Sequence, residues 1–244
     1  MFARKMPLRL QKYLHKPNHV VPQPPPPKDK EETTLFFGEK HNDMYVDQVL
    51  RSYFPNYQYK GVFFDVGAFE PITISNSHHF YLHGWDVYCF EANPNKIPLL
   101  QQHREHVFHY AITDTDTDEP LPFETVNHDG WTASFSAIKV SNKYKEIFAW
   151  DDQVQKVEVV HVPQKTLNTI IQTEIKHLSH IDILSIDVEG FELHVLRGLD
   201  LVKFPPRVIV LENADHNRQI TDYLQTFGYI LDQQISYNEY YLKK

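Results

Sequence analysis

Four short apolar segments of the chain each end in an acidic side chain, an arrangement that can bind a small ligand. The acids are Asp65, Glu91, Asp187 and Glu212. The carboxyl ends of parallel strands meet at one edge of an open α/β sheet, which is where such sheets bind ligands. A single acid at a strand end is more often a helix cap than a ligand. Four coincident ends favour one shared site, where carboxylates can accept hydrogen bonds from hydroxyl or ammonium groups.

A glycine turn follows the first of these acids. Gly67 comes two positions after Asp65, and Glu91 comes 24 positions after Gly67. Glycine lets the backbone turn tightly and approach a ligand where a Cβ atom would clash. In nucleotide-binding α/β folds, an acid roughly 20 residues beyond such a turn binds ribose hydroxyls. The Gly-x-Gly-x-x-Gly pattern that cradles a pyrophosphate is missing, so the turn favours a nucleoside with a compact cationic tail, such as S-adenosylmethionine, over NAD.

The remaining acids are candidates for the chemistry on a methyl acceptor. Asp187 and Glu189 lie two positions apart where a strand gives way to a helix, so both can face one pocket. They are the first candidates for acceptor binding or for a general base. With Glu212 they form an oxygen-rich set that suits a hard divalent ion such as Mg²⁺, which is the alternative to a base. His128 and His216 are alternative bases in loops.

The segment from His128 to Ser141 has no clear period and contains Gly130 and several serines, which is typical of a long functional loop or lid. Trp131 in this loop either stacks on a sugar face or anchors the loop. The competing interpretation of the acids is that Glu189 caps the following helix and that Glu192 is solvated.

Strand-like and helix-like segments alternate along the chain, which predicts a mainly parallel sheet covered by helices on both faces. Asn93 is expected to cap a helix that begins at Pro94. The last two strands are expected to form a closing hairpin. The expected strands are 62–64, 86–91, 107–112, 121–126, 156–162, 181–187, 207–212, 229–235 and 239–242, and the other expected helices are 42–54, 75–83, 167–178, 191–198 and 220–227.

Length and composition fit one sizeable α/β domain with a small appendage. The chain has 244 residues, of which 41% are apolar, enough to bury a normal core. No window approaches 18 uninterrupted apolar residues, so no membrane span is expected. The single cysteine, Cys89, excludes an internal disulfide and fits a reducing compartment, so we expect a cytoplasmic protein.

The first 35 residues differ in character from the rest. Residues 1–30 contain seven Lys or Arg against one Asp, a net charge of +6; since the whole chain carries −8, the remainder carries −14. Positions 22–27 contain five prolines, which predicts a basic, proline-rich arm and linker over residues 1–35, followed by one domain over residues 36–244. The arm could lie on the surface or exchange between copies, so a homo-oligomer is left open. The acidic body is a poor nucleic-acid surface, and DNA is not expected as a partner.

The strand-end acids, the glycine turn and the segments around them resemble those of the FkbM-type S-adenosylmethionine-dependent methyltransferases. The resemblance covers about residues 36–244, and its motifs are specific in combination rather than singly. The matching segments are DVGAFEP (65–71), SNS (75–77), FYLHGW (80–85), FEANP (90–94), SFSAI (134–138), VPQKTLN (162–168), IDVEGFELHVLRGL (186–199) and VIVLEN (208–213).

The resemblance implies a class I methyltransferase fold, a doubly wound, Rossmann-like and mainly parallel seven-stranded sheet with an antiparallel last strand. It also implies cofactor contact by Asp65, Gly67 and Ala68, ribose contact by Glu91, and an adenine pocket near Ala111 to Asp114.

Two departures from the family pattern bear on the site. Phe69 stands where the family commonly has Asn, and Pro71 stands where it usually has Gly, so the methionine end of the cofactor is expected to be held differently. Thr166-Leu167-Asn168 replaces a Thr-Leu-Asp pattern, a change expected to alter a helix cap rather than the chemistry.

The sequence therefore favours O-methylation of a hydroxyl on a sugar, a glycan or a related metabolite. Three alternatives stay open: an NAD(P)-dependent sugar oxidoreductase, a scaffold with this fold that no longer binds cofactor, and an RNA methyltransferase. The missing glycine fingerprint argues against the first, the presence of Asp65, Gly67 and Glu91 against the second, and the acidic body against the third.

Overall fold

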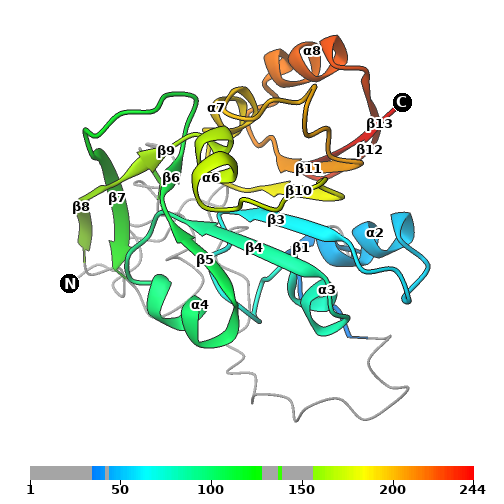
Figure 1. Cartoon of the computed structure of the whole chain (residues 1–244), viewed down its shortest axis with the longest axis horizontal. Helices are drawn as coiled ribbons and strands as arrows, with labels where there is room; N and C mark the ends of the chain where they lie inside the picture. Colours follow the sequence, from blue (N-terminus) through cyan, green and yellow to red (C-terminus); the bar gives the residue numbers. More distant parts are fainter. Residues whose placement is uncertain (1–34, 42–43, 128–136, 139–155) are drawn as a thin grey trace, which may run out of the picture.

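A seven-stranded sheet forms the centre of the structure, a computed structural model that describes residues 35–41, 44–127, 137–138 and 156–244. The strand order is β12-β13-β11-β10-β3-β4-β5 (Figure 1). The five strands β11, β10, β3, β4 and β5 are parallel, each to its neighbours in the sheet. Strand β13 runs antiparallel to both β11 and β12. The strands are β3 Val62–Val66, β4 Asp86–Glu91, β5 His106–His109, β10 Ile183–Ile186, β11 Val208–Glu212, β12 Tyr229–Ile235 and β13 Asn238–Lys243.

Helices cover both faces of this sheet because the strands bury side chains on both sides. Phe63 packs with α2, α3 and α4 on one face, which we call the α2 face, whereas Phe64 and Val66 pack with α6, α7 and α8 on the other, the α7 face. Figure 1 shows α6, α7 and α8 above the sheet and α3 and α4 below it. The helices are α2 Val46–Tyr53, α3 His78–Leu82, α4 Ile97–His103, α6 Leu167–Thr173, α7 Glu192–Arg197 and α8 Arg218–Thr226.

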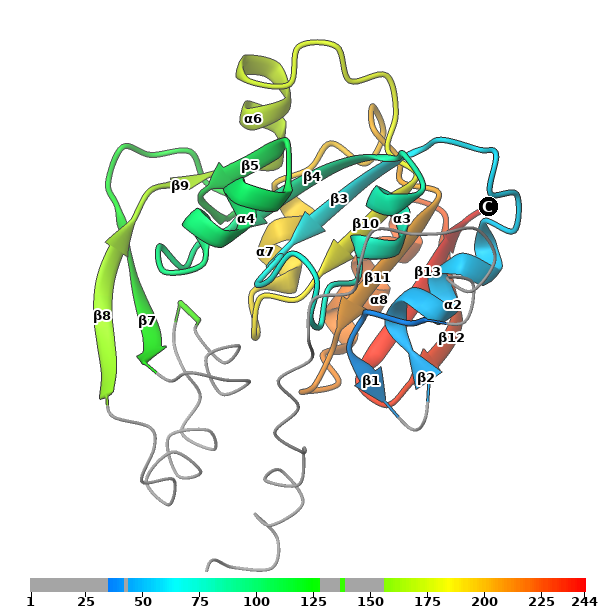
Figure 2. The same cartoon turned by 90° about the horizontal axis from the view of Figure 1, so that it is seen from below.

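Three small two-stranded sheets flank the carboxyl ends of the central strands, which we call the carboxyl rim. The hairpin of β1 (Lys40–His41) and β2 (Met44–Tyr45) lies on one side of the rim, and the hairpin of β7 (Leu121–Asn127) and β8 (Lys156–Val162) lies on the other (Figure 2). The third pairs β6 (Ala111–Ile112) with β9 (Gln164–Lys165). No helix in the described part of the chain is long and apolar enough to cross a membrane.

The expected sheet and its antiparallel last strand are confirmed, but some boundaries were wrong. The expected strand 107–112 is broken at Tyr110, because Ala111 and Ile112 leave β5 and pair with β9. The helix expected from Pro94 begins at Ile97, since the side chain of Asn93 accepts from Asn95 in a turn before the helix. The helix expected from residue 42 begins at Val46, after the β1–β2 hairpin. The arm expected over residues 1–35 lies outside the described residues, apart from Leu35.

Candidate active site

A cavity opens at the carboxyl rim, between the ends of β3, β4 and β10. The space between its lining residues, counting the part that is open to solvent, is about 570 Å³. Polar groups reach it from Glu91, Asn93 and Asp187, and its walls are largely apolar and aromatic. The residues that line it include Gly67, Phe69, Glu91, Ala111, Asp187 and Phe191.

Only glycine fits at position 67. Its φ is +84°, and a Cβ atom there would lie 1.8 Å from the carbonyl oxygen of Asp187. The backbone around it is bonded on both sides: the N–H of Gly67 donates to the carbonyl of Phe90 (2.9 Å), and the N–H of Asp187 donates to the carbonyl of Val66 (2.9 Å). Gly67 therefore lets the turn after β3 pack against β10, which brings Asp187 to the cavity wall.

Glu91 is buried at the end of β4 and is held by backbone donors. The N–H of Phe69 donates to Oε2 (2.8 Å) and that of Asn93 to Oε1 (2.7 Å), and the N–H of Ala92 also bonds the carboxylate. Burial raises the pKa of Glu91, and these N–H groups oppose the rise because they favour the charged form. A carboxylate has about four lone-pair sites, so Glu91 can still accept from a ribose hydroxyl.

Phe69, which stands where the family commonly has Asn, has a left-handed backbone with φ +50°. This conformation is rare for a bulky residue and costs about 1–3 kcal/mol. The bond to Glu91 holds it, and the Nζ atom of Lys96 lies 3.9 Å from the centre of its ring while also bonding Glu70 (2.8 Å). The ring therefore forms a fixed wall of the cavity.

Of the other residues predicted to bind the cofactor, one lines the cavity and three do not. Ala111 lines the cavity as expected, but Asp65, Ala68 and Asp114 are not among its lining residues. Asp65 is buried on the α2 face, where the Ser77 hydroxyl bonds it and burial raises its pKa to about 6. Asp114 is exposed. Direct cofactor contact by these three stays a prediction.

Asp187, Glu189 and Glu212, which we call the acid cluster, meet at the rim as the sequence predicted. Each offers an oxygen within 4.8 Å of the others, and all three are half-buried. Glu189 has a left-handed backbone (φ +55°) ahead of Gly190. Burial, followed by the charges of Asp187, Glu189 and Glu39, raises the pKa of Glu212 well above its usual range, and Glu212 and Asp187 share a hydrogen bond. Three such close carboxyls need a proton or a cation among them.

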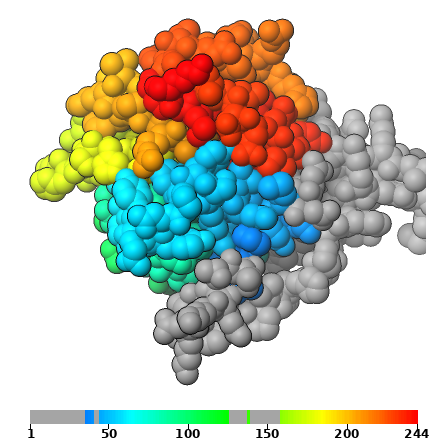
Figure 3. All heavy atoms as spheres, turned by 90° about the vertical axis from the view of Figure 1, so that its right-hand side faces the viewer, coloured from blue at the N-terminus to red at the C-terminus, as the bar shows by residue number. Residues whose placement is uncertain are grey.

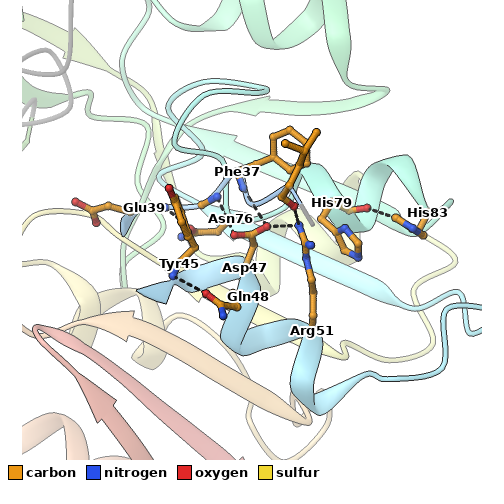
Figure 4. Close-up of polar contacts among 11 residues, drawn as sticks. Phe37, Glu39, Tyr45, Asp47, Gln48, Arg51, Asn76, His79 and His83 are labelled. Atoms are coloured by element: carbon orange, nitrogen blue, oxygen red, sulfur yellow. Dashed lines mark hydrogen bonds and ion pairs between the residues drawn. The ribbon is translucent and has the colours of Figure 1, made fainter. Parts of the chain in front are cut away.

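Residues 35–39, which we call the N-terminal strap, add a fourth carboxyl group near the acid cluster, that of Glu39, whose charge acts on Glu212. Asp47 accepts from the N–H groups of Phe37 (3.1 Å) and Gly38 (3.0 Å), and Arg51 bonds both Asp47 and the carbonyl of Leu35, as Figure 4 shows. Asp47 and Arg51 are both buried, so this ion pair fixes the strap on α2.

The strap is also joined to the central sheet. The N–H of Glu39 donates to Oδ1 of Asn76 (3.3 Å), and the amide of Asn76 donates to the Ser185 hydroxyl on β10 (3.2 Å). Ser185 precedes Asp187 by two residues, so the strap and the acid cluster are built on one bonded framework. Sequence reasoning missed this contribution, because nothing in residues 35–39 shows a motif.

Asp187 belongs to both the cavity and the acid cluster. The apolar cavity wall formed by Val66, Phe90 and Ile112 belongs to the α7 face of the sheet. Glu212 follows Leu211, which is on the α7 face, so strand alternation puts Glu212 on the α2 face. Asp187 therefore links the cavity to the acid cluster.

Several other predicted residues can now be placed. His128 and Trp131 lie outside the described residues. His216 is exposed, with φ +51° and its ring 6.3 Å from that of Tyr237. The expectation that Glu192 is solvated was wrong: it is buried at the start of α7, where its carboxylate accepts from the N–H of Gly190 (2.9 Å). Phe191 was missed as a cavity residue, because an aromatic after a turn looks the same in sequence whether it packs or lines a site.

Comparison with known proteins identifies a family for most of the chain. The model of the methyltransferase FkbM domain matches residues 65–231. Among solved structures, the chain is similar to a precorrin-6Y C5,15-methyltransferase from Geobacter metallireducens (15% identity, TM-score 0.39, 86% of this chain and 94% of that one). It is also similar to a candidate RNA methyltransferase from Pyrococcus horikoshii (11% identity, TM-score 0.40, 81% of this chain and 79% of that one). Neither likeness is close enough to transfer an activity, and no curated protein matches the chain.

The strand order, the antiparallel β13 and the cavity at the rim define a class I methyltransferase. Because the domain match covers more than half of the sequence, the chain belongs to the FkbM methyltransferase family, whose members use S-adenosylmethionine. The observed cavity suits this cofactor, since it combines the Gly67 turn, the Glu91 carboxylate and an apolar region around Ala111.

Proposed function

We propose that the protein transfers a methyl group from S-adenosylmethionine to a hydroxyl group of a sugar, a glycan or a related small metabolite. The observation that supports this most is the position of Asp187, which lines the cavity and also belongs to the acid cluster. A hydroxyl group that donates to Asp187 would stand between the cavity and the acid cluster, beside a cofactor bound in the cavity.

In this proposal the cavity residues bind and orient the cofactor. Glu91 accepts from the ribose, the backbone at Gly67 and the ring of Phe69 bound the methionine end, and Ala111 lies by the adenine. When bound, S-adenosylmethionine supplies an electrophilic methyl group and its own leaving group. The protein then has to position the acceptor and remove a proton.

Asp187 is the proposed general base, with Glu189 as an acceptor-binding residue and His128 as an alternative base. Since the raised pKa of Glu212 favours a neutral carboxyl group at pH 7, Glu212 can donate to Asp187 and hold its carboxylate in place. The ionised oxygen of Asp187 then accepts the proton of the acceptor hydroxyl as the methyl group moves.

The test is methyl transfer from labelled S-adenosylmethionine to a panel of methyl glycosides and glycans. Asp187→Asn should keep cofactor affinity, because Glu91 and Gly67 are unchanged, and should lower turnover by about 10²-fold or more, as for loss of a general base. Asp86→Asn, an exposed site at the start of β4, is the matched control. Normal turnover by Asp187→Asn would refute its role as base, and labelling of amines or RNA but of no hydroxyl compound would refute the proposed acceptor class.

A divalent ion such as Mg²⁺ is the alternative to a shared proton in the acid cluster. In that version Asp187, Glu189 and Glu212 hold the ion, which lowers the pKa of the acceptor hydroxyl. Activity should then vanish with a chelator and return with magnesium or manganese. Activity that survives chelation, together with an inactive Asp187→Asn, supports the base and excludes the ion.

A further inference from the structure

The amide nitrogen of Asn238, next to the acid cluster, is one of five buried side-chain nitrogens that have no hydrogen-bond partner in the described part of the chain. Asn238 is the first residue of β13 and only 5% exposed, yet within the described residues its Nδ2 atom has no hydrogen-bond partner. Burying an unpaired donor is unfavourable, so native structures rarely keep one without a reason. The donor is unused by the described part of the protein, and since the Nδ2 atom is closed to solvent, a ligand oxygen can reach it only when the side chains around it move.

Strand pairing places this amide beside Glu212. Asn238 on β13 is the direct partner of Glu212 on β11, and side chains that oppose each other in an antiparallel pair lie on the same face, with Cβ atoms about 4.5–5.5 Å apart. The pair two residues further along, Tyr240 and Val210, packs in the core of the α2 face. Asn238 therefore lies on the side of the sheet that carries Glu212, at the rim end of both strands.

The two side chains together match one chemical group. A hydroxyl group can donate one hydrogen bond and accept another, so it can donate to the Glu212 carboxyl oxygen while accepting from the Asn238 amide. A metal ion or an ammonium group cannot accept from an amide N–H. The pair thus selects a neutral hydroxyl over a cation.

We propose that Glu212 and Asn238 bind a second hydroxyl group of the acceptor, next to the hydroxyl that Asp187 activates. This inference rests on the proposed O-methyl transfer and narrows its acceptor to a compound with at least two neighbouring hydroxyls. Asn238 lies beyond the family match, which ends at residue 231, so the match gives no role to this residue.

The first experiment needs no acceptor. Asn238→Leu replaces the amide with an apolar group of similar size, so it should raise the melting temperature by about 2–4 °C if the amide is unpaired in the free protein. Gln234→Leu, an exposed site on the neighbouring strand β12, controls for the general effect of Leu in this hairpin and should shift it less. A melting temperature that falls in Asn238→Leu would show that the amide already has a partner, and would overturn the proposal.

The second experiment uses the methyl glycoside that the wild-type protein methylates best. Asn238→Asp replaces the donor with an acceptor, so KM for that glycoside should rise about tenfold or more, while the Kd of S-adenosylhomocysteine should not change. Asn56→Asp makes the same chemical change at an exposed turn before β3 and should alter neither value.

Monodeoxy versions of the same glycoside identify the hydroxyl that is bound. Removing that hydroxyl should raise KM for the wild-type protein and should have little further effect in Asn238→Asp. An unchanged KM in Asn238→Asp, or equal effects of every deoxy glycoside in both proteins, would overturn the inference. Failure of the proposed function is distinct from this, since the wild-type protein would then label no hydroxyl compound at all.

Discussion

The buried carboxyl group of Asp65 links the stability of the protein to pH. Its pKa is about 6 in the folded protein, mainly because burial disfavours the charged form, and 3.8 is its ordinary value. The stabilising contribution of the protonated group is fully present below pH 3.8 and is lost as the pH rises through 6. The difference corresponds to about 3 kcal/mol in the free energy of unfolding.

Asp65→Asn removes this titration, so the free energy of unfolding of the variant relative to wild type should rise by about 2 kcal/mol between pH 4 and pH 7, since part of the difference is already lost at pH 4. Urea unfolding across that range measures it. Parallel curves for the two proteins would show that Asp65 does not titrate in this window.

At Glu91 the expected loss is in cofactor affinity. Glu91→Ala removes the charged acceptor for the ribose and should weaken binding of S-adenosylhomocysteine by roughly 1–3 kcal/mol, measured by calorimetry. Glu91→Gln keeps one acceptor oxygen and should lose less, whereas Asp86→Asn, at the exposed start of the same strand, should leave the affinity unchanged. A folded Glu91→Ala with unchanged affinity would exclude β4 from the cofactor site.

The sequence predicted which kinds of residue form the site better than it predicted the face of the sheet to which each side chain points. Gly67, Glu91 and Ala111 do line one cavity, because a glycine turn and a strand-end acid have few structural alternatives. The direction of Asp65 could not be predicted, since β3 is buried along its whole length and its apolar pattern does not distinguish the two faces. Asn238 could not have been found either, because its significance depends on a partner 26 positions earlier in the chain.

At the scale of the elements, the N-terminal strap depends on one ion pair. Asp47 and Arg51 are buried, and removing one partner leaves an unpaired charge. Asp47→Leu or Arg51→Met alone should therefore cost about 3–5 kcal/mol in the free energy of unfolding, and the double variant should cost clearly less. Urea unfolding of the four proteins tests this, and additive losses would mean that the two residues do not act as a pair.

Element boundaries were less predictable than element types. The Thr166 hydroxyl caps α6 by accepting from the N–H of Thr169 (3.1 Å), and Asn168, the departure from the family pattern, accepts from the N–H of Asp200 (2.8 Å). The Asn168 contact joins α6 to the loop after α7 and is not part of the cap, so the expectation that this change alters a helix cap stays a prediction. Asn93, by contrast, uses its side chain in a turn rather than as the expected cap, because local sequence fits both uses and tertiary contacts decide between them.

At the scale of the whole molecule, the first described residues are bonded to α2, and α2 is in turn packed against the end of the chain. Arg51 bonds the carbonyl of Leu35, and α2 packs against the C-terminal strands, with Tyr53 donating to Asp232 (2.7 Å), a contact region visible in Figure 3 as blue against red. Deleting residues 1–30 should therefore leave the melting temperature and the affinity for S-adenosylhomocysteine unchanged. A deletion variant that loses either would show that the arm contributes to the core or the cavity.

The position of β13 between β11 and β12 has a consequence for synthesis. The chain emerges from the ribosome in sequence order, so β11 is complete before its neighbour on that side exists. Until residues 238–243 have emerged, the edge of β11 and the end that carries Glu212 stay open, and an open edge can pair with another chain. The nascent protein therefore depends on its last strand both to protect the edge of the sheet and to bring Asn238 to the rim. Messenger RNAs truncated before the codons of that strand should yield chains that need a chaperone to stay soluble.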